Sequence, residues 1–178
     1  RKTLHLYQKK FLEKLRSNLD ELDGNEHEHK LGSAIYDLFE NYTSIFPDSS
    51  LSDNWMAPTD TPGNQQGDEV VVNFKIFGQA FIGLNGGPQF PHSEAISFQI
   101  PCKDQGEIDK YWQLLTADGG SEGQCGWLKD KFGLSWQIIP KQLGECLGNP
   151  DPSKSAAALN AMMGMSKLII SELEAAIK

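Results

Sequence analysis

The pattern of apolar and polar positions divides the first third of the chain into two helices and a loop. Apolar side chains recur at helical spacing in residues 1–23 and again from Ser33 to Phe46, which predicts two amphipathic helices. A polar linker separates them, and Pro47 ends the second helix because proline cannot continue the hydrogen-bond ladder. Residues 51–69 are rich in turn formers and predict a long loop, of the kind that serves as a lid or a binding loop.

From residue 70 the apolar period changes to two, which is typical of half-buried strands. A turn at Gly78-Gln79 joins the first two predicted strands into a hairpin. A second turn, residues 130–133, joins another pair, and Lys129 and Asp130 beside it could form an exposed ion pair. The predicted strands are residues 70–77, 80–85, 94–100, 124–129 and 134–140.

Two further helices complete the pattern. Asp104, with Glu107 three residues later, predicts the capped start of a helix that runs to about Ala117. Pro152 to Ile177 carries apolar residues, several of them methionines, at helical spacing and predicts one long helix. The resulting order from residue 33 is helix, hairpin, strand, helix, hairpin, helix. This order predicts an α+β fold in which helices cover one face of mainly antiparallel strands.

Four stretches carry a family resemblance: residues 42–49, 77–88, 94–100 and, most distinctively, 124–140. They resemble the PhnB-like family of the glyoxalase/bleomycin resistance (vicinal oxygen chelate) superfamily, often labelled 3-demethylubiquinone-9 3-methyltransferase. The resemblance implies paired βαβββ modules at about 33–92 and 93–150, whose sheet curls into a cleft, followed by a helix at 152–178. Residues 1–32 are then an N-terminal extension. The first strand of the first module is either Lys2 to Tyr7 or Lys30 to Ile35.

Metal-using members of this superfamily hold a divalent ion with His, Glu or Gln side chains from four strands. The resemblance places three of these ligand positions at Gly83, Ala95 and Gln137, and the fourth on the unassigned first strand, where His5 is a candidate. Gly83 and Ala95 have no donor atom, and a lone glutamine is a weak ligand for ions that prefer imidazole and carboxylate. We therefore expect no metal and no cofactor.

Strand alternation predicts what the cleft floor presents instead of a metal. If Gln137 points into the cleft, so do Ser135 and Ile139, and if Ala95 does, so do Ser97 and Gln99. Phe81, Gly83 and Asn85 are assigned to the cleft side of the first hairpin. The predicted ligand-binding residues are Asn85, Ser97, Gln99, Ser135, Gln137, Gly83 and Ala95. Such neutral polar groups suit a neutral or weakly polar small molecule, or a pocket that holds only water.

Charge, apolar content and cysteines restrict the partners and the compartment. The formal net charge of −8 argues against a nucleic-acid partner, which needs a basic surface. No apolar run reaches the roughly 20 residues of a membrane-spanning helix, and the basic N-terminal residues lack the apolar segment of a signal peptide. Cys102, Cys125 and Cys146 fit neither a disulfide framework nor a metal motif, which favours reduced thiols in a cytoplasmic protein.

Three functions from different classes are consistent with the sequence. The first is a small-molecule-binding protein without a catalytic metal, in the manner of bleomycin-sequestering relatives, and we expect it to be a homodimer. The second is the methyltransferase that the family label suggests, although the chain has no Gly-rich strand-to-helix motif for its cofactor. The third is a metal-dependent lyase of the glyoxalase kind, which the missing ligands argue against. We rank the first highest.

Overall fold

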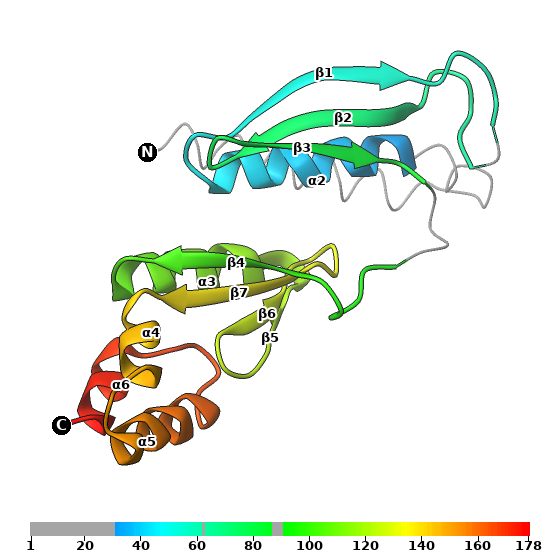
Figure 1. Ribbon diagram of the computed structural model, residues 1–178. Coiled ribbons are helices and arrows are strands. Elements are labelled where there is room, and N and C mark those ends of the chain that lie inside the picture. Colours follow the sequence, from blue (N-terminus) through cyan, green and yellow to red (C-terminus); the bar gives the residue numbers. More distant parts are fainter. Residues whose placement is uncertain (1–30, 62, 87–90) are drawn as a thin grey trace. The chain divides into compact units, whose positions relative to one another are not determined.

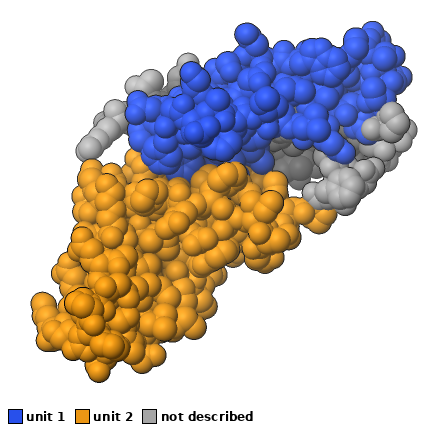
Figure 2. All heavy atoms as spheres, viewed as in Figure 1, with its two compact units in different colours: residues 1–89 blue, residues 90–178 orange. Residues whose placement is uncertain are grey.

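The computed structural model describes residues 31–61, 63–86 and 91–178. The helix expected at residues 1–23, the linker after it and the strand alternative at Lys2 to Tyr7 lie outside these residues. The chain forms two compact units, residues 1–89 and 90–178, which Figure 2 shows in different colours. Each unit has its own sheet.

The described part of unit 1 consists of a helix packed on a three-stranded antiparallel sheet (Figure 1). Helix α2, Leu31–Ile45, confirms the helix predicted for Ser33 to Phe46. The alternative that placed a first strand at Lys30 to Ile35 is wrong, because residues from Leu31 onward are helical. The strands follow one another in the sheet as in the chain: β1 (Ser50–Met56), β2 (Glu69–Ile76) and β3 (Gln79–Leu84).

The hairpin predicted from the period-two pattern is confirmed as β2 and β3, with its turn one residue earlier than expected. Ile76 pairs with Gln79, so Phe77 and Gly78 are the two turn residues. Both have positive φ, 51° and 74° respectively, as a type I′ turn requires. The twist of this turn matches that of the flanking strands, and Gly78 adopts its conformation without a Cβ penalty.

Strand β1 replaces the first part of the loop predicted for residues 51–69. It is an edge strand with mostly exposed or half-buried residues, so no apolar alternation marks it in the sequence. Its register with β2 also shifts between Leu51 and Asn54, which breaks the period. Asn73 on β2 donates its side-chain amide to the Asp53 carbonyl over 2.7 Å and holds the irregular part of the strand.

Unit 2 has the order strand, helix, strand, strand, strand (Figure 1). Its elements are β4 (Ser97–Cys102), α3 (Gln105–Thr116), a 3₁₀ turn at Ala117–Gly119, β5 (Ser121–Glu122), β6 (Trp127–Lys129) and β7 (Ser135–Pro140). The sheet order is β4-β7-β6-β5, in which β4 and β7 are parallel and the other neighbours antiparallel. The predicted α+β class is therefore confirmed, as is the strand expected at 134–140.

Helix α3 confirms the predicted capped helix in detail. The Asp104 carboxylate accepts from the Glu107 amide over 2.9 Å, as an N-cap does. Glu107 reaches back to the Lys103 amide over 3.0 Å, one residue beyond the usual capping box. This bond to a backbone amide lowers the pKa of Glu107. The expected core side chains of the helix are all buried: Ile108, Tyr111, Trp112 and Leu115.

The single helix predicted for Pro152 to Ile177 is wrong, because that stretch is interrupted. The chain after β7 forms α4 (Gln142–Leu147), α5 (Pro152–Met163) and α6 (Ile170–Ala176). Between α5 and α6 the carbonyls of Met165 and Ser166 accept from the amides of Cys125 and Gly126, over 2.8 and 2.7 Å. Of the helices in the described residues, none is long and apolar enough to cross a membrane.

Candidate functional site

The sheet of unit 2 has one face toward α3 and one face lined by polar side chains. Leu128, Trp136 and Ile138 point toward α3 and are buried, so they form the part of the core between the sheet and this helix. Alternation along the strands directs the intervening residues to the opposite side. We call that side the polar face and define it by six residues: Trp127, Lys129, Ser135, Gln137, Ser97 and Gln99.

Two cross-strand rows make up the polar face. Lys129, Ser135 and Ser97 are direct partners on β6, β7 and β4. Trp127, Gln137 and Gln99 form the next row. The Gln137 amide joins the rows by donating to the Ser97 hydroxyl over 2.8 Å. The structure thus brings four of the seven predicted residues onto one face: Ser97, Gln99, Ser135 and Gln137.

The other three predicted residues do not belong to this face. Ala95 lies in the turn before β4 and is exposed. Assigning Gly83 to the cleft side is wrong, because a Cβ there would overlap the ring of Phe39 on α2. Asn85, in the same unit, donates its side-chain amide to the Glu69 carbonyl over 3.2 Å and is 8% exposed.

An aromatic stack explains why this side of the first hairpin faces the helix. Phe39 of α2 stacks on Phe74 of β2 with ring centroids 3.8 Å apart. Phe74 stacks in turn on its cross-strand partner Phe81, with centroids 5.3 Å apart. Phe81 and Gly83 share one side of β3, so both face α2. The opposite side of this sheet carries the exposed apolar residues Trp55, Ile82 and Leu84.

Sequence reasoning missed the charged group on the polar face. Lys129 forms an ion pair with Glu94, from the turn before β4, and not with Asp130 as expected. Hydrogen bonding to the Lys129 ammonium lowers the pKa of Glu94. The strand register could have revealed this group. Once β6 and β7 pair as a hairpin, Lys129 must lie on the same face as its partner Ser135.

The donor set of the polar face does not fit a divalent metal. Serine hydroxyls and glutamine amides are neutral, whereas such ions prefer imidazole and carboxylate. Lys129 adds a positive charge beside Ser135, which repels a cation. In the part of the chain that the structure describes, no three His, Cys, Asp or Glu side chains gather where they could hold a metal.

The strand-to-helix connections of the described residues lack the Gly-rich motif expected for the cofactor of a methyltransferase. A Gly-rich turn lets the backbone approach a ligand closely. Within the described ranges, the strand-to-helix turns are Lys103-Asp104, between β4 and α3, and Lys141, between β7 and α4. Neither turn contains glycine, so neither provides that approach.

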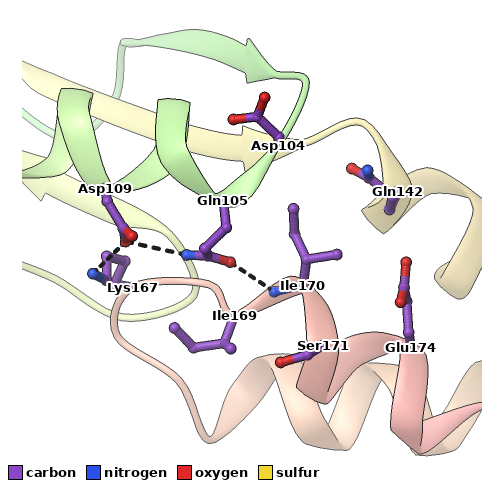
Figure 3. Close-up of a pocket in the computed structure, with 9 residues that line it drawn as sticks. All are labelled: Asp104, Gln105, Asp109, Gln142, Lys167, Ile169, Ile170, Ser171 and Glu174. Atoms are coloured by element: carbon purple, nitrogen blue, oxygen red, sulfur yellow. Dashed lines mark hydrogen bonds and ion pairs between the residues drawn. The ribbon is translucent and has the colours of Figure 1, made fainter.

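A separate pocket of about 480 Å³ lies beside the N-terminus of α3 (Figure 3). Gln105 donates to Asp109 over 3.2 Å and accepts from the Ile170 amide over 3.0 Å. Asp109 also pairs with Lys167, and these two bonds lower the pKa of Asp109. Because these polar groups bond one another, they fasten α6 to α3 and leave few donors for a ligand. The lining residues are Asp104, Gln105, Asp109, Gln142, Lys167, Ile169, Ile170, Ser171 and Glu174.

The cysteines differ in burial, and we expect them to differ in reactivity. Burial raises the pKa of the Cys102 thiol to about 12 and also raises that of Cys146. Since only the thiolate attacks, both stay inert at mildly alkaline pH, whereas the half-buried Cys125 reacts first with iodoacetamide. Peptide mass spectrometry after timed labelling checks this order, and equal labelling of Cys102 and Cys125 in folded protein would contradict it.

A family model described as 3-demethylubiquinone-9 3-methyltransferase matches residues 32–139, more than half of the 178 residues. The chain belongs to this family. The PhnB-like resemblance of the sequence is thereby confirmed at the level of the family. All six residues of the polar face lie inside the matched range.

One solved structure with the same family description supports the assignment. It is the "Putative 3-demethylubiquinone-9 3-methyltransferase, PhnB protein, from Bacillus cereus", 26% identical, with a TM-score of 0.53. The similarity covers 59% of this chain and 89% of that chain. A protein from Staphylococcus aureus is 23% identical over 60% of this chain and 87% of its own, with a TM-score of 0.24. None of the curated proteins matches the sequence.

Proposed function

We propose that this member of the family binds a small organic molecule on the polar face of unit 2. The observation that carries the proposal is the arrangement of neutral polar groups there. Gln137 is held by its bond to Ser97, and Ser135, 1% exposed, has a hydroxyl without a hydrogen-bond partner among the described residues. Fixed polar groups of this kind orient ligands in small-molecule sites, and a buried hydroxyl without a partner is uncommon unless a ligand or water completes it.

The proposal includes the architecture of the vicinal oxygen chelate superfamily, with paired βαβββ modules. Unit 2 supports it with its order of strand, helix and three strands. The described part of unit 1 supports it with a helix followed by three strands. The proposal also includes the absence of a catalytic metal, which the neutral donors and the charge of Lys129 support.

The decisive experiment replaces Gln137 with leucine in the full chain. A mixture of small neutral and anionic fragments is titrated while the amide resonances of β4 and β7 are followed by NMR. We expect Gln137→Leu to weaken the binding of those fragments by about tenfold or more, because it removes a polar contact and the bond that orients Ser97. Gln113→Leu, at an exposed position on α3, serves as the matched control and leaves binding unchanged.

Three outcomes would contradict the proposal. Fragments that shift no resonance of β4 or β7 would exclude this face as a binding site. Saturable binding of S-adenosylmethionine in a calorimetric titration would favour methyl transfer, as the family's description suggests. Stoichiometric zinc, nickel or manganese in the purified protein would favour a metal-dependent enzyme.

A further inference from the structure

One row of the polar face consists entirely of groups that can donate hydrogen bonds. Lys129, Ser135 and Ser97 are direct cross-strand partners on three neighbouring strands. Neighbouring strands of a sheet lie about 4.7–4.9 Å apart, so one ligand group can reach more than one of these side chains. The Lys129 ammonium group donates hydrogen bonds and never accepts them, so the row favours a ligand group that is a hydrogen-bond acceptor.

Both serine hydroxyls of the row can donate a hydrogen bond to a ligand. Ser97 Oγ accepts from Gln137, so the Ser97 hydroxyl hydrogen is directed elsewhere. Ser135 Oγ is buried and has no partner among the described residues. A native protein rarely leaves such a hydroxyl unsatisfied, and an acceptor brought by a ligand would complete it.

Glu94 already shows which kind of group the ammonium attracts. Its carboxylate comes from the turn before β4, outside the sheet, and pairs with Lys129. The Glu94 side chain is 64% exposed and the Lys129 side chain 40% exposed. Exposed ion pairs contribute little to stability, so a ligand anion can replace the Glu94 carboxylate at small cost.

We propose that the site is specific for a small organic anion whose carboxylate displaces that of Glu94 from Lys129 and accepts from Ser135 and Ser97. This inference rests on the proposed function and changes the expected ligand from neutral to anionic. Trp127, two residues before Lys129 on the same face, offers an aromatic surface to the body of the ligand. The ligand class is therefore a carboxylate attached to a planar, mostly apolar group.

Benzoate and benzamide test the inference because they share a shape and differ in charge. Calorimetric titration of the full chain is expected to give benzoate at least about tenfold tighter binding than benzamide, the ratio that one hydrogen bond to a charged group supplies. Lys129→Gln is expected to remove this preference. Glu94→Gln is expected to raise benzoate affinity severalfold, because it removes the competing carboxylate.

Two further variants separate a local site from a general effect of charge. Lys131→Gln removes an exposed lysine of the neighbouring turn and leaves benzoate affinity unchanged. Ser135→Ala keeps the charge and weakens benzoate more than benzamide. Far-UV circular dichroism shows that each variant is folded.

The outcomes distinguish this inference from the function on which it rests. If fragments bind at β4 and β7 but benzoate binds no better than benzamide, the proposed preference for an anion is wrong, while the proposed binding face is supported. If neither benzoate, benzamide nor any fragment shifts the amide resonances of β4 and β7, both the binding face and the preference for an anion are wrong. If Lys131→Gln weakens benzoate as much as Lys129→Gln, the preference reflects overall charge, and the proposed row is not the site.

Discussion

Replacing Asp130 with alanine is expected to lower the free energy of unfolding of unit 2 by about 3–5 kcal/mol, since each orphaned buried donor costs about 1–3 kcal/mol. Asp130 is 4% exposed and holds the turn between β6 and β7. One carboxylate oxygen accepts from the amides of Phe132 and Leu134, over 2.9 and 3.1 Å. The other accepts from the Trp136 indole over 2.8 Å. Alanine leaves all three donors without this acceptor.

Urea unfolding of the full chain, followed by tryptophan fluorescence, measures the loss. Asp130→Asn keeps one acceptor oxygen, so its free energy of unfolding is expected to fall less than that of the alanine variant. Asp118→Asn is the matched control, because Asp118 is exposed and asparagine tolerates its φ of 56°. A stability of Asp130→Ala within about 0.5 kcal/mol of the unmodified protein, the range of ordinary surface changes, would show that the carboxylate does not hold the turn.

The second large effect is expected at Gly83, where alanine should destabilise unit 1 by about 1–3 kcal/mol through overpacking. The added methyl group would overlap the ring of Phe39. That ring cannot move away freely, because it stacks on Phe74 with an interplanar angle of 23°. The strain therefore falls on the contact between α2 and the sheet.

The control for this substitution is Gly86→Ala, because a Cβ at Gly86 would meet no atom within 4 Å. In thermal unfolding, Gly83→Ala should have a clearly lower midpoint temperature than Gly86→Ala. Adding Phe39→Leu to Gly83→Ala should recover part of the loss, since the smaller side chain makes room for the methyl group. If the double variant is as unstable as the sum of the two single variants, the overlap with Phe39 is not the cause.

The sequence could predict elements whose signals are local. Helix α3 was predicted with its cap because Asp104 and Glu107 lie within one turn of each other. The hairpin of β2 and β3 was predicted because its period and its glycine turn are adjacent in the chain. The polar face was predicted in part because Ser97 and Gln137 each lie on a strand with clean alternation.

Other features depend on residues that are distant in sequence. The apolar period continues from α5 into α6, but the chain leaves the helix between them, where the carbonyls of Met165 and Ser166 bond to the distant Cys125 and Gly126. The side of Gly83 was ambiguous because apolar residues lie on both faces of the first hairpin. The position of Phe39, on helix α2, shows that Gly83 faces the helix.

The charged part of the candidate site was missed for a similar reason. The carboxylate next to Lys129 in the sequence, Asp130, and the carboxylate next to it in space, Glu94, have different roles. Asp130 accepts from the Trp136 indole and from backbone amides, while Glu94 reaches Lys129 from the turn before β4. Neighbouring positions on a strand point to opposite faces, so the pairing of Lys129 had to come from elsewhere.

The parallel pairing of β4 with β7 has a consequence for synthesis on the ribosome. Each strand of unit 1 pairs with one that is next to it in the chain, so this sheet can form as it emerges. Among the described strands, β4 has no neighbour until β7 has been made, after α3, β5 and β6. Non-local pairing of this kind is slow and leaves strand edges exposed in the meantime. We therefore expect the nascent chain to pass through a stage in which β4 is unpaired and vulnerable to aggregation.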